Sequence, residues 1–313
     1  MRWLYVMAIV GLIGGLAGCG GGGGNGDQPL TARGNMLVVS YFDWLITTPP
    51  PQPQGQEFYQ VSASLWMPQT APLLSGLTLH MPYTVISPIL TGPALLSPTS
   101  GTNELGVPLY VYWGSATVAP TGQPTIVAPG AYCPGYIRPT ESLYLYSGTN
   151  DLDSPVSVSG SYNLVGGSGY TRTWTVPDGQ QMPAAVSITQ PMAPVANTLQ
   201  PIHIAWNAVP NVSGYLVNVE ADLKDKDKNV IRHIAWTSAP QAAFFDTVFD
   251  LSDLLLPATT LSVDVPAGIF RGCDAIQVDI LAQAAPYVDQ TQQPALRIVN
   301  ASMSTQVFAL FEQ

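Results

Sequence analysis

The chain has 313 residues and a formal net charge of −10, with 10 Lys and Arg against 20 Asp and Glu. Charged residues make up 10% of it and hydrophobic residues 46%, a balance that excludes an intrinsically disordered protein and a charge-rich coiled coil. Because basic residues are scarce and form no cluster, a nucleic-acid partner is not expected.

The start of the chain is typical of a secretory signal peptide. Arg2 precedes an apolar run that is shorter than the roughly 20 residues needed to span a bilayer. The run ends in Leu16-Ala17-Gly18-Cys19, which resembles the lipobox of bacterial lipoproteins. The resemblance implies that residues 1–18 are cleaved off and that Cys19 is acylated. An ordinary cleaved signal with an incidental cysteine, or a short membrane anchor, are the alternative interpretations.

The segment after Cys19 is rich in glycine, with five consecutive glycines at Gly20–Gly24. Such composition predicts a flexible tether over residues 19–34, which would hold a folded domain away from the membrane. In Gram-negative lipoproteins an Asp after the cysteine favours the inner membrane, and here the residue is Gly20. The resemblance therefore implies a protein of the cell envelope, anchored through the lipid on Cys19, with the outer membrane as the expected location.

The rest of the chain is predicted to be all-β. Its recurring unit is a short run rich in Val, Ile, Tyr and Thr and bounded by turn residues, as in sandwiches and barrels. Two β-sandwich-like domains are expected, at residues 35–180 and 181–313, because prolines punctuate the segment between Asp178 and Pro201. The predicted strands are Met36–Ser40, Tyr59–Trp66, Leu109–Trp113, Ser142–Ser147, Val156–Ser159, Thr171–Val176, Ile202–Trp206, Tyr215–Glu220, Val230–Trp236, Leu261–Val265, Ile276–Leu281 and Thr305–Phe311.

The C-terminal part carries a more specific pattern. Tyr215, Val217 and Val219 fall on one face of a strand at period two, and Trp206 on the preceding strand is expected to fill the core. This pattern resembles the fibronectin type III domain, in which a Trp on the second strand packs under a third strand of this kind. The resemblance implies an immunoglobulin-like sandwich used for extracellular spacing or binding, and it implies no catalytic chemistry.

One internal repeat is visible in the first half. Residues 100–111 match residues 147–158 at seven of twelve positions, beginning with Ser-Gly-Thr-Asn in both copies. A duplicated turn-plus-strand unit would explain the match, and so would chance in a chain rich in turn residues.

Few residues point to catalysis or metal binding. The three histidines, His80, His203 and His233, are too far apart in the sequence for a zinc-binding helix motif, and strand histidines are usually structural. The acidic stretch 222–229 has Asp225, Asp227 and Asn229 at calcium-loop spacing. However, it lacks the later ligands and is interleaved with lysines, so a solvated hairpin turn is expected. We expect no enzyme activity, no metal and no cofactor.

The two cysteines that follow the lipobox are Cys133 and Cys273. Export to an oxidising compartment permits a disulfide between them, which would join the two predicted domains. Two buried thiols are the alternative, and geometry decides between them.

The tyrosines of two predicted strands suggest a binding surface. Tyr110 and Tyr112 alternate with aliphatic residues in one strand, as do Tyr144 and Tyr146 in another. If the aliphatic faces are buried, the four tyrosines form an outward platform suited to a glycan or another envelope protein. Tyrosines that merely tolerate a half-exposed sheet face are the alternative.

These features together predict a non-enzymatic, membrane-anchored surface lipoprotein with a structural or binding role. A glycan-binding module that uses the tyrosine face is the second hypothesis.

Overall fold

The computed structural model describes residues 35–47, 56–68, 71, 73–82, 91–95, 103–131, 143–154, 156–191, 195–196, 199–240 and 254–311. Strands dominate these residues, and their one short helical segment is the 3₁₀ turn η2 (Gly167–Gly169). The prediction of an all-β protein is therefore confirmed. Within the same ranges, no helix is both long and apolar enough to cross a membrane.

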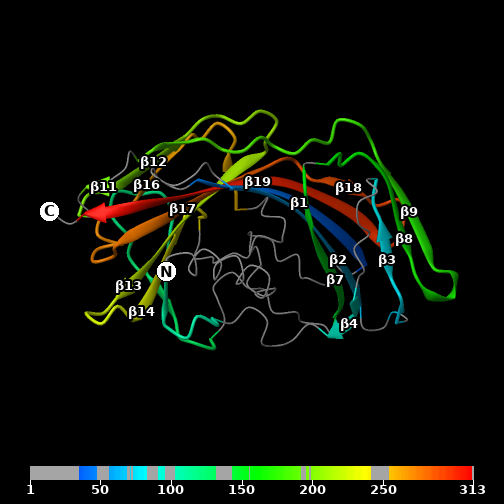
Figure 1. The fold of residues 1–313 in the computed structure, drawn as a ribbon, viewed down its shortest axis with the longest axis horizontal. Coiled ribbons are helices and arrows are strands. Elements are labelled where there is room, and N and C mark those ends of the chain that lie inside the picture. Colours follow the sequence, from blue (N-terminus) through cyan, green and yellow to red (C-terminus); the bar gives the residue numbers. More distant parts are fainter. Residues whose placement is uncertain are drawn as a thin grey trace.

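A 13-stranded sheet forms the body of the molecule (Figure 1). Three of its strands are short and lie beside the main path: β11 (Val195–Ala196) and β18 (Tyr287–Asp289) pair with β19, and β15 (Leu256–Pro257) pairs with β13. The main path runs in the order β4 (Thr91–Leu95), β7 (Leu143–Leu152), β2 (Gln56–Pro68), β1 (Met36–Thr47), β19 (Ala295–Phe311), β17 (Ala275–Gln283), β13 (Gly214–Lys224), β14 (Val230–Thr237), β5 (Leu109–Trp113) and β6 (Thr125–Val127).

The first and last described strands lie side by side in the middle of this sheet. β1 and β19 are parallel, with a continuous register from Met36 opposite Ala295 to Thr47 opposite Gln306. Figure 1 shows the blue β1 running along the red β19. Because β19 has 17 residues, its later part extends beyond β1 and pairs with β17 on its other edge.

Two three-stranded sheets cover opposite ends of the main sheet (Figure 1). One contains β3 (Thr78–His80), β8 (Gly160–Val165) and β9 (Thr171–Val176), and the other contains β10 (Ile188–Gln190), β12 (Ile202–Trp206) and β16 (Ser262–Val265). Each buries an apolar face against the main sheet, which gives two sandwich-like layers of strands.

The two sandwiches have separate hydrophobic clusters that share one strand. In β19, Leu296 and Ile298 belong to the N-terminal cluster, whereas Phe308 and Leu310 belong to the C-terminal cluster. The main N-terminal members are Leu37, Val39, Tyr41, Val61, Leu65, Leu79, Tyr162, Leu164 and Trp174. The main C-terminal members are Ile204, Trp206, Tyr215, Val217, Val219, Trp236, Val265, Phe270, Ile276 and Val278.

The pattern on which the C-terminal prediction depended is present. Tyr215, Val217 and Val219 are all buried on one face of β13. Trp206 is 3% exposed, and its ring meets the ring of Tyr215 edge-on at a centroid distance of 5.4 Å. The alternation along β13 therefore selects the face that β12 covers.

Most predicted strands are confirmed, and three differ. Val156–Ser159 contains no strand, and β8 begins only at Gly160. The last strand begins at Ala295, ten residues before the predicted Thr305. The duplicated turn-plus-strand unit is wrong, because residues 147–152 lie in β7 while residues 105–107 form a bend before β5.

The sheet does not follow the order of the predicted domains. β5 and β6, which lie in the predicted N-terminal domain, extend the C-terminal edge of the main sheet, where β5 pairs in parallel with β14. β1 in turn reaches the C-terminal strand β19. One sheet thus runs through both parts of the chain.

Candidate functional site

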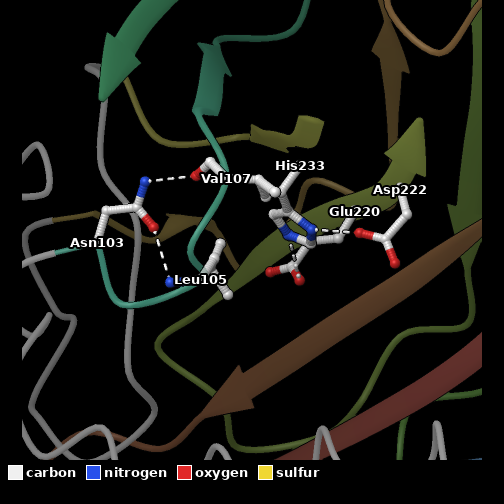
Figure 2. Close-up of polar contacts among 6 residues, drawn as sticks. All are labelled: Asn103, Leu105, Val107, Glu220, Asp222 and His233. Carbon is white, nitrogen blue, oxygen red and sulfur yellow. Dashed lines mark hydrogen bonds and ion pairs between the residues drawn. The ribbon is translucent and has the colours of Figure 1, made fainter. Parts of the chain in front are cut away.

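A histidine held by two carboxylates is the most strongly polarised group in the described part of the chain (Figure 2). Glu220 and Asp222 alternate with buried Val219 and Ala221 on β13, so they emerge on the face opposite the C-terminal cluster. His233 lies directly opposite Asp222 on the neighbouring strand β14. The antiparallel register therefore brings the three side chains together.

Both ring nitrogens of His233 are engaged. Nδ1 lies 2.9 Å from Oδ1 of Asp222, and Nε2 lies 3.3 Å from Oε2 of Glu220. Burial alone would lower the pKa of His233, but the hydrogen bonds and charges of Asp222 and Glu220 outweigh burial and raise the pKa to about 9. The imidazole is therefore a cation at neutral pH, and both of its N–H groups donate.

This state limits what His233 can do chemically. A general base or a metal ligand needs a neutral imidazole with a free lone pair, and a base works best with a pKa near the working pH. A doubly bonded imidazolium instead fastens β13 to β14. The sequence considered His233 without its partners, and the cross-strand register supplies them.

A second polar network lies on the same face, three strands wide. Asp279 of β17 accepts hydrogen bonds from Thr305 of β19 and, at 2.9 Å, from Nε2 of Gln277. Thr305 Oγ1 in turn accepts a hydrogen bond of 2.8 Å from Nε1 of Trp44 on β1. Burial, followed by the negative charge of Glu220, raises the pKa of Asp279 to about 7. The network links the N-terminal strand to the C-terminal sandwich.

A buried asparagine shapes the segment beside His233 (Figure 2). Asn103 is 2% exposed; its Nδ2 donates to the carbonyl oxygens of Val107 and Val127, and its Oδ1 accepts from the Leu105 amide. These bonds fix the bend that precedes β5. The carbonyl of Pro108 at its end accepts the backbone N–H of His233 at 3.0 Å.

The four tyrosines of the suggested platform are not brought together. Tyr110 and Tyr112 on β5 are half-buried against the C-terminal cluster, and the guanidinium of Arg232 lies 4.0 Å from the ring centroid of Tyr110. Tyr144 and Tyr146 belong to β7, and their side chains lie outside the described residues. Six strands separate β5 from β7, which is about 30–35 Å along a sheet.

The remaining site residues are only partly described. Cys273 is buried at 5% exposure in the C-terminal cluster. Cys133, and with it the possible disulfide to Cys273, lies outside the described residues, as do Cys19 and the whole of residues 1–34.

The acidic stretch forms the tip of the β13–β14 hairpin, as predicted. Oδ1 of Asp225 accepts the backbone N–H groups of Asp227 and Asn229 at 2.8 and 2.9 Å, and its Oδ2 accepts from Asn229 Nδ2. The hydrogen bonds from Asn229 are the main reason why the pKa of Asp225 is lowered. The carboxylate of Asp225 thus closes the turn.

Sequence reasoning missed Trp44, Thr305 and Asp279 altogether. Each stands on a predicted strand or beside one, but only the pairing of β1 with β19 and of β19 with β17 makes them neighbours. A buried acidic residue in an otherwise aliphatic strand, as Asp279 is in Ile276–Leu281, was the available signal.

Comparison with known proteins leaves function to be inferred from the chain itself. No protein-family model matches the sequence, and no curated protein matches it significantly.

Proposed function

We propose that this protein is a lipid-anchored lipoprotein of the cell envelope, whose β-sandwich body has a non-enzymatic structural or binding role. The observation that carries the proposal is the motif Leu16-Ala17-Gly18-Cys19, placed between an apolar leader and a glycine-rich segment. Acylation of Cys19 would insert several acyl chains into the bilayer, enough for stable anchoring.

The spacing between the motif and the fold supports this role. Cys19 and Met36, the first residue of β1, are 17 positions apart. A glycine-rich chain of that length has a root-mean-square span of about 20–25 Å, which exceeds the thickness of one headgroup layer. The sandwich body would therefore stand clear of the membrane surface. Gly20 after the cysteine makes the outer membrane the proposed location.

The C-terminal sandwich supports a spacing or binding role. We propose that it is a fibronectin type III-like module: the sheet β10-β12-β16 packs on the neighbouring strands β14, β13, β17 and β19 through Trp206 and Tyr215. Domains of this architecture present loops and sheet edges to partners. The fully engaged imidazolium of His233 supports a structural role for the opposite face.

The test is to express the full chain in a Gram-negative host with radiolabelled fatty acid. We expect label in the wild-type protein and its recovery with the outer membrane. Cys19→Ser should abolish the label and leave the signal peptide attached, whereas Cys133→Ser, which removes a different cysteine, should be labelled normally. Equal labelling of Cys19→Ser would overturn the proposal.

A further inference from the structure

The face of the main sheet between the two hydrophobic clusters is polar. β1, β2 and β19 run side by side there, and their register places Asp43 of β1 between Ser302 of β19 and Tyr59 of β2. Because side chains alternate, Asp43 shares a face with Tyr41 of the N-terminal cluster. The polar residues of this face form what we call the junction island: Asp43, Glu57, Tyr59, Asn300, Ser302 and Ser304.

The register brings oxygen atoms around Asp43 from both sides. Asn300 and Ser304 stand two residues before and after Ser302, so each is a diagonal neighbour of Asp43 across β1 and β19. Glu57 is a diagonal neighbour on β2, where it is exposed at the border of the island. Diagonal neighbours in a sheet lie about 7–8 Å apart, so one small ligand between them can be reached by all of them.

Three of these oxygens are buried without a donor. Asp43 is 8% exposed, Asn300 1% and Ser304 2%. In the part of the chain that the structure describes, nothing forms a hydrogen bond with Oδ1 of Asp43, Oδ1 of Asn300 or Oγ of Ser304.

The fourth member of this row is engaged. Ser302 donates its hydroxyl to the carbonyl oxygen of Ala184 at 2.8 Å, in the segment that joins β9 to β10. That segment therefore passes over the island.

Such an arrangement requires compensation. Burial, followed by the negative charge of Glu57, raises the pKa of Asp43 to about 6, so the carboxylate is still mostly ionised at neutral pH. A buried carboxylate without a hydrogen-bond donor is costly, and buried charges in proteins are normally paired or bound to metal ions. Two carboxylates, an amide oxygen and a hydroxyl oxygen on one face call for a positive partner.

We propose that the junction island binds a calcium ion, with oxygen ligands from Asp43, Glu57, Asn300 and Ser304. Ca²⁺ accepts carboxylate and amide oxygens in flexible arrangements of six to eight ligands, whereas Mg²⁺ demands a strict octahedron. Among the described residues, no three His, Cys, Asp or Glu side chains gather for a metal, so uncharged oxygens and water must complete the shell. With two carboxylates, the affinity belongs in the range of extracellular modules, about 10⁻⁴–10⁻³ M.

The proposed ion has a structural consequence. It would tie β1 to β19 at the place where the N-terminal and C-terminal clusters meet, and below the segment held by Ser302. An envelope protein in a calcium-containing medium would gain stability from the ion by mass action.

The site is tested by calorimetric titration of the detergent-purified full chain with CaCl₂ after treatment with a chelator. We expect one saturable site and a rise in melting temperature of a few degrees at ten times the dissociation constant. Asp43→Asn should abolish binding, and Glu57→Gln, at an exposed position, should weaken it about tenfold or more. Asp178→Asn, which removes an exposed charge in the segment between β9 and β10, should bind like the wild type.

A second readout covers the case in which Asp43→Asn folds poorly. Terbium replaces calcium in oxygen sites and emits when a nearby aromatic ring absorbs light, and Tyr59 flanks Asp43. We expect terbium emission that calcium displaces and that Glu57→Gln reduces. The absence of saturable binding up to about 10 mM calcium, ten times the top of the expected range, or unchanged binding in both variants, would overturn the proposal.

Discussion

The indole Nε1 of Trp44 donates a hydrogen bond of 2.8 Å to Oγ1 of Thr305, although 261 positions separate the two residues in the chain. Thr305 passes the contact on by donating to the carboxyl group of Asp279 on β17. A single hydroxyl thus connects the first strand to the C-terminal sandwich through a buried network.

Thr305→Val should therefore destabilise the protein. Valine keeps the shape of threonine but leaves the Trp44 N–H and one oxygen of Asp279 without a partner, at about 1–3 kcal/mol each. We expect a loss of about 2–4 kcal/mol in the free energy of unfolding in urea. Thr175→Val on the exposed face of β9 is the control and should change stability by less than about 0.5 kcal/mol. Equal effects of the two substitutions would show that the network is energetically unimportant.

His233 should make stability depend on pH in the alkaline range. Its pKa is about 9 in the folded protein against 6.5 for the free side chain, so its contribution is complete below pH 6.5 and is lost as pH rises through 9. The shift corresponds to about 2–4 kcal/mol. Unfolding of wild type and His233→Gln in urea at pH 6, 7.5 and 9.5 measures it.

The difference between these two proteins should shrink steadily from pH 6 to pH 9.5. His203→Gln is the matched control, because His203 pairs with Asp264 at 2.8 Å on the exposed surface of β12 and β16. A difference that stays constant with pH would show that His233 does not titrate with folding.

Asp279 should act with its own pH window. Its pKa is raised from 3.8 to about 7, so the protonated form is favoured in the fold, and this stabilisation is lost as pH rises from about 4 through 7. Asp279→Asn cannot titrate and should remove that part of the pH dependence of unfolding. Asp178→Asn should retain it. A variant with the wild-type slope between pH 4 and 7 would assign the slope to another group.

Trp206→Ala should destabilise the whole chain in one transition. Truncating a buried Trp costs about 3–5 kcal/mol. The sequence predicted that the N-terminal part would keep most of its stability, but β19 supplies Leu296 to one cluster and Phe308 to the other. Near-ultraviolet and far-ultraviolet circular dichroism should therefore report coincident unfolding. Two separate transitions would show that the sandwiches fold independently.

Local features of the fold could be predicted from the sequence. The strands β5, β9 and β12 have the predicted bounds, because period-two alternation and flanking turn residues are local signals. The burial of Trp206 and Tyr215 followed from the same alternation.

Strand partners could not be predicted. Nothing local in β1 indicates that it pairs with β19, and nothing in β5 indicates a parallel pairing with β14 at the far end of the sheet. The tyrosine platform failed for this reason: alternation placed Tyr110 and Tyr112 on one face correctly, but it contained no information about the distance between β5 and β7. The partners of His233 and Asp279 depend on register in the same way.

The mass of the N-terminal peptide of the mature protein tests the central claim most directly. Purified from outer membranes and digested, the protein should yield a first peptide that begins at Cys19 and carries the added mass of a diacylglyceryl group and an amide-linked fatty acid. A first peptide that begins at any other residue, or an unmodified Cys19, would contradict the account of this protein as a lipid-anchored envelope component.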